Sequence, residues 1–192
     1  MFLLNQELDD TVEINGREIE LDLSFDNVLD VFDVFKETAD ESEKIYAAVY
    51  LLTGEKVIDE LEGEEIALVL SKALDDHIKT DNSQEFVEYD LAGNPMTRAD
   101  DSDEEEGNKI ISLEWDAEYI WTSFVQAYDI DLHQEFGSLH WRKFKALLRD
   151  LPQETKIKQI IEIRSWKPTA DTTADEKKRM KKLQEEYELP DE

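Results

Sequence analysis

Cysteine is absent from this chain of 192 residues, and glycine and proline are scarce, with six and four copies. Without cysteine there are no disulfides and no thiolate metal ligands, so the sequence predicts a reducing compartment. The glycines are scattered, and Thr53 to Lys56 lacks the upstream glycine and the Ser or Thr of a phosphate-binding loop. A dinucleotide fingerprint and a G-x-S-x-G elbow are also missing. None of these motifs therefore supports an enzymatic function.

Long apolar runs are missing as well. No run approaches the roughly 20 residues that a membrane-spanning helix needs. The N-terminal segment MFLLNQELDD has an apolar patch, but no basic residue flanks it and acidic residues follow, which is unlike a signal peptide. We therefore expect a cytoplasmic protein without a membrane partner.

Basic residues are few and unevenly distributed. The chain has 21 Lys and Arg against 49 Asp and Glu, a net charge of −28. Residues 1–110 hold 32 acidic and 8 basic residues, whereas Ser138 to Lys182 holds 13 basic and 6 acidic ones. The overall charge repels nucleic acids and membrane surfaces, so we expect neither as a partner. It also keeps a protein soluble at high concentration, which suits a carrier or chaperone, although most carboxylates need only be a solvated surface.

The N-terminal region predicts a small β-hairpin. From Val12 to Leu21, apolar and polar residues alternate around Asn15-Gly16. This dipeptide favours positive φ at both turn positions, which is the geometry of a type I′ turn. Because a ribbon of two strands is marginal alone, we expect it to pack on helices.

Three helices are expected after the hairpin. Ser24 is placed to cap the first helix, Asp40 is placed to cap the second, and Gly54 is a natural stop. The third helix is expected near Glu64 to Lys79. The predicted apolar faces are Phe25, Val28, Leu29, Phe32 and Phe35 in the first, Ile45, Ala48, Val49 and Leu52 in the second, and Ile66, Val69, Leu70, Ala73, Leu74 and Ile78 in the third.

The second half of the chain predicts four more helices. Asp116 lies in the first turn of the first, and a second one follows a short link. Pro152 suits the first turn of the third, which Trp166-Lys167-Pro168 ends. Thr173 to Glu176 is a capping box for the last helix, whose thin apolar stripe indicates light docking or a role with a partner. The predicted apolar faces are Ala117, Ile120, Trp121, Phe124, Val125 and Tyr128; Trp141, Phe144, Leu147, Leu148 and Leu151; Ile157, Ile160 and Ile161; and Met180, Leu183 and Tyr187.

These patterns predict a mainly α protein, a helical bundle-like domain with a small N-terminal β-hairpin and a disordered acidic loop. The organisation we expect is a hairpin with three helices in 1–79, an acidic flexible segment in 80–110, a helical module in 111–168 and a C-terminal helix in 169–192, forming one domain overall. The charge run from Asp100 to Gly107 has nothing to bury and is the core of the predicted loop.

Metal and catalytic sites are not expected. A calcium loop with Gly107 at its sixth position would place Leu113 where a bidentate Glu is required. His133 and His140 are seven residues apart without further ligands, and His77 lies near the apolar face of a helix. Paired carboxylates arise by chance in so acidic a chain. We therefore predict no enzyme activity, no cofactor and no metal.

The stretch from Asp116 to Lys167 is the strongest candidate for recognition. It contains all but one of the four Trp, and its tryptophans lie near Arg and Lys in an otherwise acidic chain. Aromatic residues at helical spacing belong more often to a core than to a contact surface, and basic residues often pair with a protein's own carboxylates. We nevertheless predict a partner-binding helix face consisting of Trp141, Arg142, Phe144, Lys145, Leu148 and Arg149, with the three cations forming one exposed basic stripe.

The same stretch resembles a known family over about fifty residues, with a looser fit in the N-terminal part. The family is the phage gene-product-fifteen family, encoded in the tail modules of siphophages and of prophages of Gram-positive bacteria. The residues that carry the resemblance are Asp116-Ala-Glu-Tyr-Ile120, Phe124-Val-Gln-Ala-Tyr128, Ile130-Asp131-Leu132, Leu139-His140-Trp141 with Lys143-Phe144, Leu147-Leu148, Leu151-Pro152 with Glu154-Thr155-Lys156, and Ile163-Arg164.

The resemblance implies a tail assembly chaperone. Such a protein binds the tape measure protein, assists the major tail tube protein in polymerising around it, and works in the cytoplasm of the bacterial host without remaining in the mature virion. It leaves self-association open. Two alternatives remain: an acidic DNA mimic that inhibits a host nuclease or restriction enzyme, which the acidic N-terminal part favours and the basic stretch disfavours, and a permanent structural component of the tail.

Overall fold

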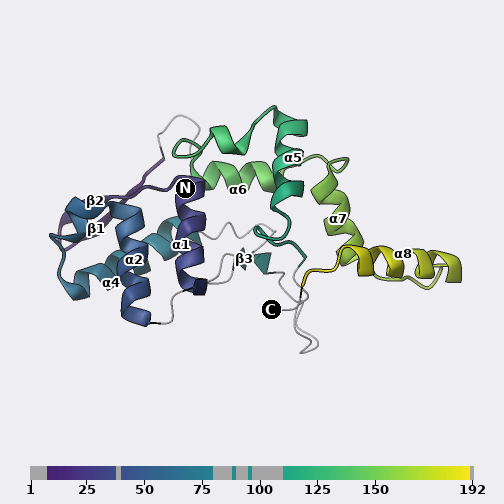
Figure 1. Cartoon of the computed structure of the whole chain (residues 1–192), viewed down its shortest axis with the longest axis horizontal. Coiled ribbons are helices and arrows are strands. Elements are labelled where there is room, and N and C mark those ends of the chain that lie inside the picture. Colours follow the sequence, from purple (N-terminus) through teal and green to yellow (C-terminus); the bar gives the residue numbers. More distant parts are fainter. Residues whose placement is uncertain (1–7, 38–39, 80–87, 90–94, 97–109, 191–192) are drawn as a thin grey trace. The chain divides into compact units, whose positions relative to one another are not determined.

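The computed structural model describes residues 8–37, 40–79, 88–89, 95–96 and 110–190 (Figure 1). The chain forms two compact units, each built from two separate stretches of sequence. The N-terminal unit comprises Met1–Ser83 with Phe136–Lys145, and the C-terminal unit comprises Gln84–Glu135 with Ala146–Glu192. The predicted fold class is confirmed: the described residues form eight α-helices and a small N-terminal hairpin. The acidic run from Asp100 to Gly107 lies outside the described residues.

The predicted hairpin is confirmed. Strands β1 (Thr11–Ile14) and β2 (Arg17–Glu20) are antiparallel, with Val12 opposite Ile19. Asn15 and Gly16 have φ values of 52° and 80°, as a type I′ turn requires. The alternating apolar residues face inward, toward helices of the same unit, and β1 lies against α4.

The first helices follow the sequence signals closely. Asp40 accepts a hydrogen bond from the N–H of Glu43, and Gly54, at φ 78°, ends the helix that Asp40 begins. Ser24 precedes the first helix, but its hydroxyl donates to Asp22 Oδ1 at 2.7 Å. The elements are α1 (Phe25–Glu37), α2 (Glu41–Thr53), a short α3 (Glu55–Ile58) that the sequence analysis missed, and α4 (Gly63–Lys72).

The predicted helix from Glu64 to Lys79 consists of two elements. After α4 the chain continues as a π-helical turn, η1 (Ala73–Ile78). The i→i+5 hydrogen bonding of a π turn widens the helix, and both Ala73 and Ile78 are buried here. The turn therefore brings both ends of η1 into the core of the unit.

A distant stretch completes the N-terminal unit. The N–H of Phe25 donates to the carbonyl of Leu139 at 2.9 Å, and the N–H of Trp141 donates to the carbonyl of Leu23 at 2.7 Å. These bonds flank an antiparallel bridge between Ser24 and His140. The start of α6 (Trp141–Arg149) is thereby fixed against the start of α1.

The C-terminal unit is helical around a buried side-chain network. Its elements in the described residues are α5 (Ala117–Tyr128), the 3-10 turn η2 (Leu132–Gln134), α7 (Lys156–Ser165), α8 (Ala174–Glu186) and the short strands β3 (Glu88–Tyr89) and β4 (Pro95–Met96). As predicted, Thr173 accepts from the N–H of Glu176 at the start of α8, and α7 ends before Trp166.

Two expectations for this unit were wrong. Val125, placed on the apolar face of α5, is 39% exposed, and Ala117, placed on the same face, is exposed too, whereas Ser123 is buried. The buried face is rotated toward Ser123 because its hydroxyl accepts the N–H of Ile157 at 3.3 Å and so joins α5 to α7. Pro152 is not in the first turn of α7, since its carbonyl accepts the N–H and the hydroxyl of Thr155 in a turn that precedes the helix.

A buried ion pair connects the helices of the C-terminal unit. Arg164 binds both carboxylate oxygens of Asp116, at 2.6 and 2.9 Å. Asp116 is 1% exposed and also accepts the N–H of Ser112. Arg164 further donates to the carbonyls of Ile110 and Tyr187. The pair thus joins the start of α5, the end of α7 and the chain just after α8.

Candidate partner-binding surface

The three apolar residues of the predicted surface are in the core. Trp141 is fully buried, and Phe144 and Leu148 are nearly so. The ring of Phe144 stacks on those of Trp141 and Phe25 with centroid separations of 5.5 and 5.0 Å, and Phe32 meets Trp141 edge-on. These side chains therefore support α6 from beneath and do not line an open groove.

Lys145 is not on an exposed stripe, which corrects the prediction for this residue. Its Nζ donates to the carbonyl of Ile78 at 2.7 Å, and the same oxygen accepts the indole N–H of Trp141. The ammonium also lies 5.4 Å from the centroid of the Trp141 ring. Burial, with a smaller effect from Arg142, lowers the pKa of Lys145 to about 8. The carbonyl end of a helical turn attracts a cation, and η1 ends at Ile78.

The other two predicted cations differ from each other. Arg149 is exposed, and its Nε and Nη2 atoms donate to the two carboxylate oxygens of Asp150 at 2.8 and 2.9 Å. The side chain of Arg142 is half-buried. The three basic residues of α6 therefore have three different environments, and a role of the stripe in binding a partner stays a prediction.

His140 positions the start of α6. Its Nδ1 accepts the backbone N–H of Arg142 at 2.9 Å, which is the bond of an N-cap. Its Nε2 lies 2.8 Å from Asp10 Oδ1. Burial lowers the pKa of His140, while Asp10 raises it to a lesser extent. In the sequence this histidine stood out as a possible ligand and as part of the family resemblance, and its capping role was not predicted.

The most concentrated positive charge in the described residues is on α8. We name it the α8 basic cluster: Lys177, Lys178, Arg179, Lys181 and Lys182. All five side chains are exposed, and none of them forms an ion pair within the described residues. Figure 1 shows α8 in yellow. The run of cations was visible in the sequence, but only the structure places all of it at the surface.

The last turns of α8 anchor the helix. The amide of Gln184 donates to the carbonyls of Ile163 and Trp166 at 3.0 and 2.9 Å, where α7 ends. Lys156 Nζ donates to the hydroxyl of Tyr187 at 2.6 Å and lies 4.4 Å from the centroid of its ring. These contacts hold the C-terminal end of α8, away from most of the α8 basic cluster.

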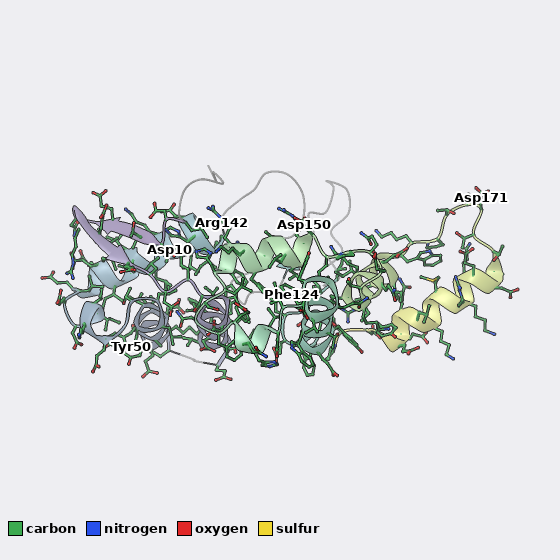
Figure 2. All side chains as sticks on the ribbon, turned by 90° about the horizontal axis from the view of Figure 1, so that it is seen from above. Asp10, Tyr50, Phe124, Arg142, Asp150 and Asp171 are labelled. Carbon is green, nitrogen blue, oxygen red and sulfur yellow. The ribbon has the colours of Figure 1, made fainter. Side chains whose placement is uncertain are left out.

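Exposed aromatic residues form a second candidate contact region. Tyr46 and Tyr50 lie one turn apart on α2 and are 48% and 45% exposed; Figure 2 marks Tyr50. Tyrosine rings are common at protein interfaces because one end is apolar and the other remains hydrated. Single exposed apolar residues are common on protein surfaces, whereas two large rings on one helix face offer a partner a larger continuous apolar area. The sequence pattern predicted the buried apolar face of this helix and no contact surface on its exposed side.

The described residues contain no group of three or more His, Cys, Asp or Glu side chains that could hold a metal ion. His77 bonds to the carbonyl of Thr11 at 2.9 Å, and His133 lies edge-on to Trp121. No helix in the described ranges has the length and apolar character needed to span a bilayer.

The comparisons with known proteins give one family. The chain matches the family described as Bacteriophage Gp15 protein over residues 4–189. Neither the comparison with curated proteins nor that with solved structures gives a match. The family match covers both units and the residues that position α6 and α8. The chain therefore belongs to the Bacteriophage Gp15 protein family.

Proposed function

We propose that this chain is a phage tail assembly chaperone that binds the tape measure protein and assists polymerisation of the major tail tube protein around it. The observation that carries the proposal is the family match over residues 4–189, which indicates a structural or assembly-related role in a phage. In this proposal the protein is not an enzyme. It acts in the cytoplasm of the bacterial host and is absent from the mature virion.

The surface chemistry supports reversible holding of a helical partner. A tape measure protein is a very long helical chain, and its apolar stripe aggregates unless it is covered. The rings of Tyr46 and Tyr50 offer apolar area on one face of α2, while their hydroxyls stay hydrated. A net charge of −28 keeps the complex soluble. A modest interface of this kind permits release when tube subunits arrive.

The predicted α6 surface takes a narrower role in this proposal. Trp141, Phe144 and Leu148 hold the helix in place from the core. Arg142 and Arg149 then set the register of the partner through its acidic residues. Arg149 would exchange its contact with Asp150 for one with the partner, and exposed ion pairs exchange at little cost.

Co-expression with the tape measure protein encoded by the same phage tests the proposal. We expect the tape measure protein to become soluble and to co-purify with this chain, and purified virions to lack the chain. A tape measure protein that stays insoluble, with nothing retained, would refute the chaperone function. Host nucleases would then be screened for inhibition by the chain.

Charge-reversal variants test the surface. Arg142→Glu combined with Arg149→Glu is expected to reduce recovery of the tape measure protein, while Lys56→Glu combined with Lys143→Glu changes the net charge equally at exposed sites outside the predicted surface. Tyr46→Ser combined with Tyr50→Ser is expected to reduce recovery as well. Unchanged recovery with the arginine pair would exclude the two arginines, and unchanged recovery with the tyrosine pair would exclude the face of α2.

A permanent structural role in the tail is the second candidate, because family membership supports it equally. The two functions differ in where the protein is found. Mass spectrometry of purified phage particles is expected to detect a structural subunit at a fixed ratio to the tube protein. A chaperone is expected in the lysate and not in the particles.

A further inference from the structure

The α8 basic cluster concentrates like charge on one short stretch of helix. Residues four apart on a helix are neighbours, and the cluster contains two such pairs of like charge, Lys177 with Lys181 and Lys178 with Lys182. The last turn of α8 has no basic residue to complement the helix dipole. Asp175, Glu185 and Glu186 lie four positions from Arg179, Lys181 and Lys182, but none of these pairs forms an ion pair in the described residues, so the cluster is open to a negatively charged surface.

The cluster is accessible for such contact. The side chains that anchor α8, including Gln184 and Tyr187, are near its C-terminal end. Met180, within the cluster sequence, is the buried residue of the helix. The five cations thus project from a helix that is held at Met180 and at its C-terminal end, and they form no ion pair inside the described residues.

The chain itself carries a complementary surface on its hairpin. Glu13, Glu18 and Glu20 are exposed, because their neighbours in the two strands face the core. Glu13 lies directly opposite Glu18, and like charges in that position destabilise a strand pair. The two surfaces are therefore complementary in charge.

We propose that the α8 basic cluster of one copy of this chain docks on the acidic outer face of the β1–β2 hairpin of a second copy. In this contact the cations of α8 in one copy face the glutamates of the hairpin in the other. Because the two surfaces differ, the contact is heterologous, and copies joined by it either close into a ring or leave a free cluster at one end and a free hairpin face at the other. This inference goes beyond the proposed function and does not depend on it.

The charge distribution favours a second copy over a nucleic acid. Residues 8–79 hold 21 acidic and 6 basic residues, whereas Ser138 to Lys182 holds 13 basic and 6 acidic ones. Docking of the α8 basic cluster on the hairpin of another copy places opposite charges together. A nucleic acid has negative charge along its whole length, so the chain's net charge of −28 repels it and it offers no basic region in return.

Sedimentation of the full chain at low and high salt tests the contact. At about 50 mM salt we expect the average mass to rise with concentration above that of the 22.4 kDa chain, and at about 0.5 M we expect a monomer. Lys178→Glu combined with Lys182→Glu is expected to weaken association by about tenfold or more. Lys56→Glu combined with Lys143→Glu makes the same change in net charge outside α8, and this variant is expected to retain most of the association.

A charge-swap experiment identifies the two surfaces. Glu18→Lys combined with Glu20→Lys is expected to weaken self-association to a similar extent, while an equal mixture of this variant with Lys178→Glu/Lys182→Glu associates again. Circular dichroism establishes that both variants are folded. A mixture that stays monomeric overturns the hairpin contact. A wild-type chain that is monomeric at low salt overturns the proposal, and binding of a short DNA duplex to the cluster in that case identifies a polyanion as its partner.

Discussion

At the scale of single residues, the ring of His140 joins two parts of the N-terminal unit in its neutral form. Nδ1 accepts the N–H of Arg142, so the proton of the neutral ring is on Nε2, which faces Asp10 Oδ1 at 2.8 Å. Burial lowers the pKa of His140 below its ordinary 6.5. As the pH falls through 6.5, the unfolded chain binds the proton more readily than the folded one. The contribution of His140 to stability is therefore complete above this pH and is lost below it.

Two substitutions separate the roles of His140. His140→Asn keeps an acceptor for the N–H of Arg142 but does not titrate, whereas His140→Gln keeps a donor that reaches Asp10 but loses the cap, at a cost of about 1 kcal/mol. We expect the stability of the wild type relative to His140→Asn to fall between about pH 7.5 and about pH 5.5. Urea unfolding at both pH values measures this change. Parallel pH profiles would contradict the assignment.

The lowered pKa of Lys145 predicts a second change in the stability of the folded chain, at alkaline pH. Its value in the folded chain is about 8, below the ordinary 10.5. Between these values the unfolded chain holds the proton and the folded one has lost it, so stability rises with pH across the window. Relative to Lys145→Met, the wild type is expected to gain about 2 kcal/mol between pH 8 and about pH 9.5. Guanidinium unfolding measures it, and Lys145→Arg, which keeps its charge, serves as the control that gains nothing.

At the scale of secondary-structure elements, the buried pair of Asp116 and Arg164 connects the start of α5, the end of α7 and the chain just after α8. Removing one partner leaves a buried charge without its counterion, which costs about 3–5 kcal/mol. We expect Asp116→Asn and Arg164→Gln each to destabilise the C-terminal unit, and the double variant to cost about 1–3 kcal/mol less than the sum. Chemical denaturation of all four proteins completes the cycle. Additive effects would mean that the two residues act separately.

The anchoring of α8 is a second prediction at this scale. Tyr187→Phe keeps the ring under the Lys156 ammonium and loses only the hydroxyl contact, whereas Tyr187→Ala loses both. We expect amide exchange in α8 to increase strongly in the alanine variant and slightly in the phenylalanine variant. Lys177→Ala is a matched control within the same helix, because its side chain is exposed. Equal exchange in all three variants would show that Tyr187 does not hold the helix.

Local signals predicted the elements well and long-range contacts poorly. Asp40, Gly54 and Thr173 act through bonds to residues a few positions away, and Asn15-Gly16 acts through its own backbone conformation, so the sequence alone was sufficient for them. Lys145 was misplaced because its carbonyl partner, at Ile78, is distant in sequence. For the same reason no sequence pattern could identify the capping ring of His140 with Asp10, or the hydroxyl of Ser123 with the N–H of Ile157.

At the scale of the whole molecule, self-repulsion among the carboxylates opposes folding. The chain carries a net charge of −28, with most of the excess acid in residues 1–110. Salt screens such repulsion, with a Debye length of about 10 Å at 0.1 M. We therefore expect the unfolding temperature to rise as salt is increased from about 10 mM to about 0.3 M, measured at low protein concentration. A flat or falling temperature would show that attractive ion pairs outweigh the repulsion.

Because the N-terminal unit is discontinuous in sequence, it cannot be completed during synthesis until its second stretch has left the ribosome. Met1–Ser83 leaves the ribosome first, but Trp141 and Phe144, which fill the core beside Phe25 and Phe32, come from Phe136–Lys145. The nascent N-terminal region must therefore wait, with apolar surface uncovered, until most of the chain has been made. A fragment ending at Ser83 would stay in that waiting state, and a peptide spanning 136–145 supplied to it would close the core.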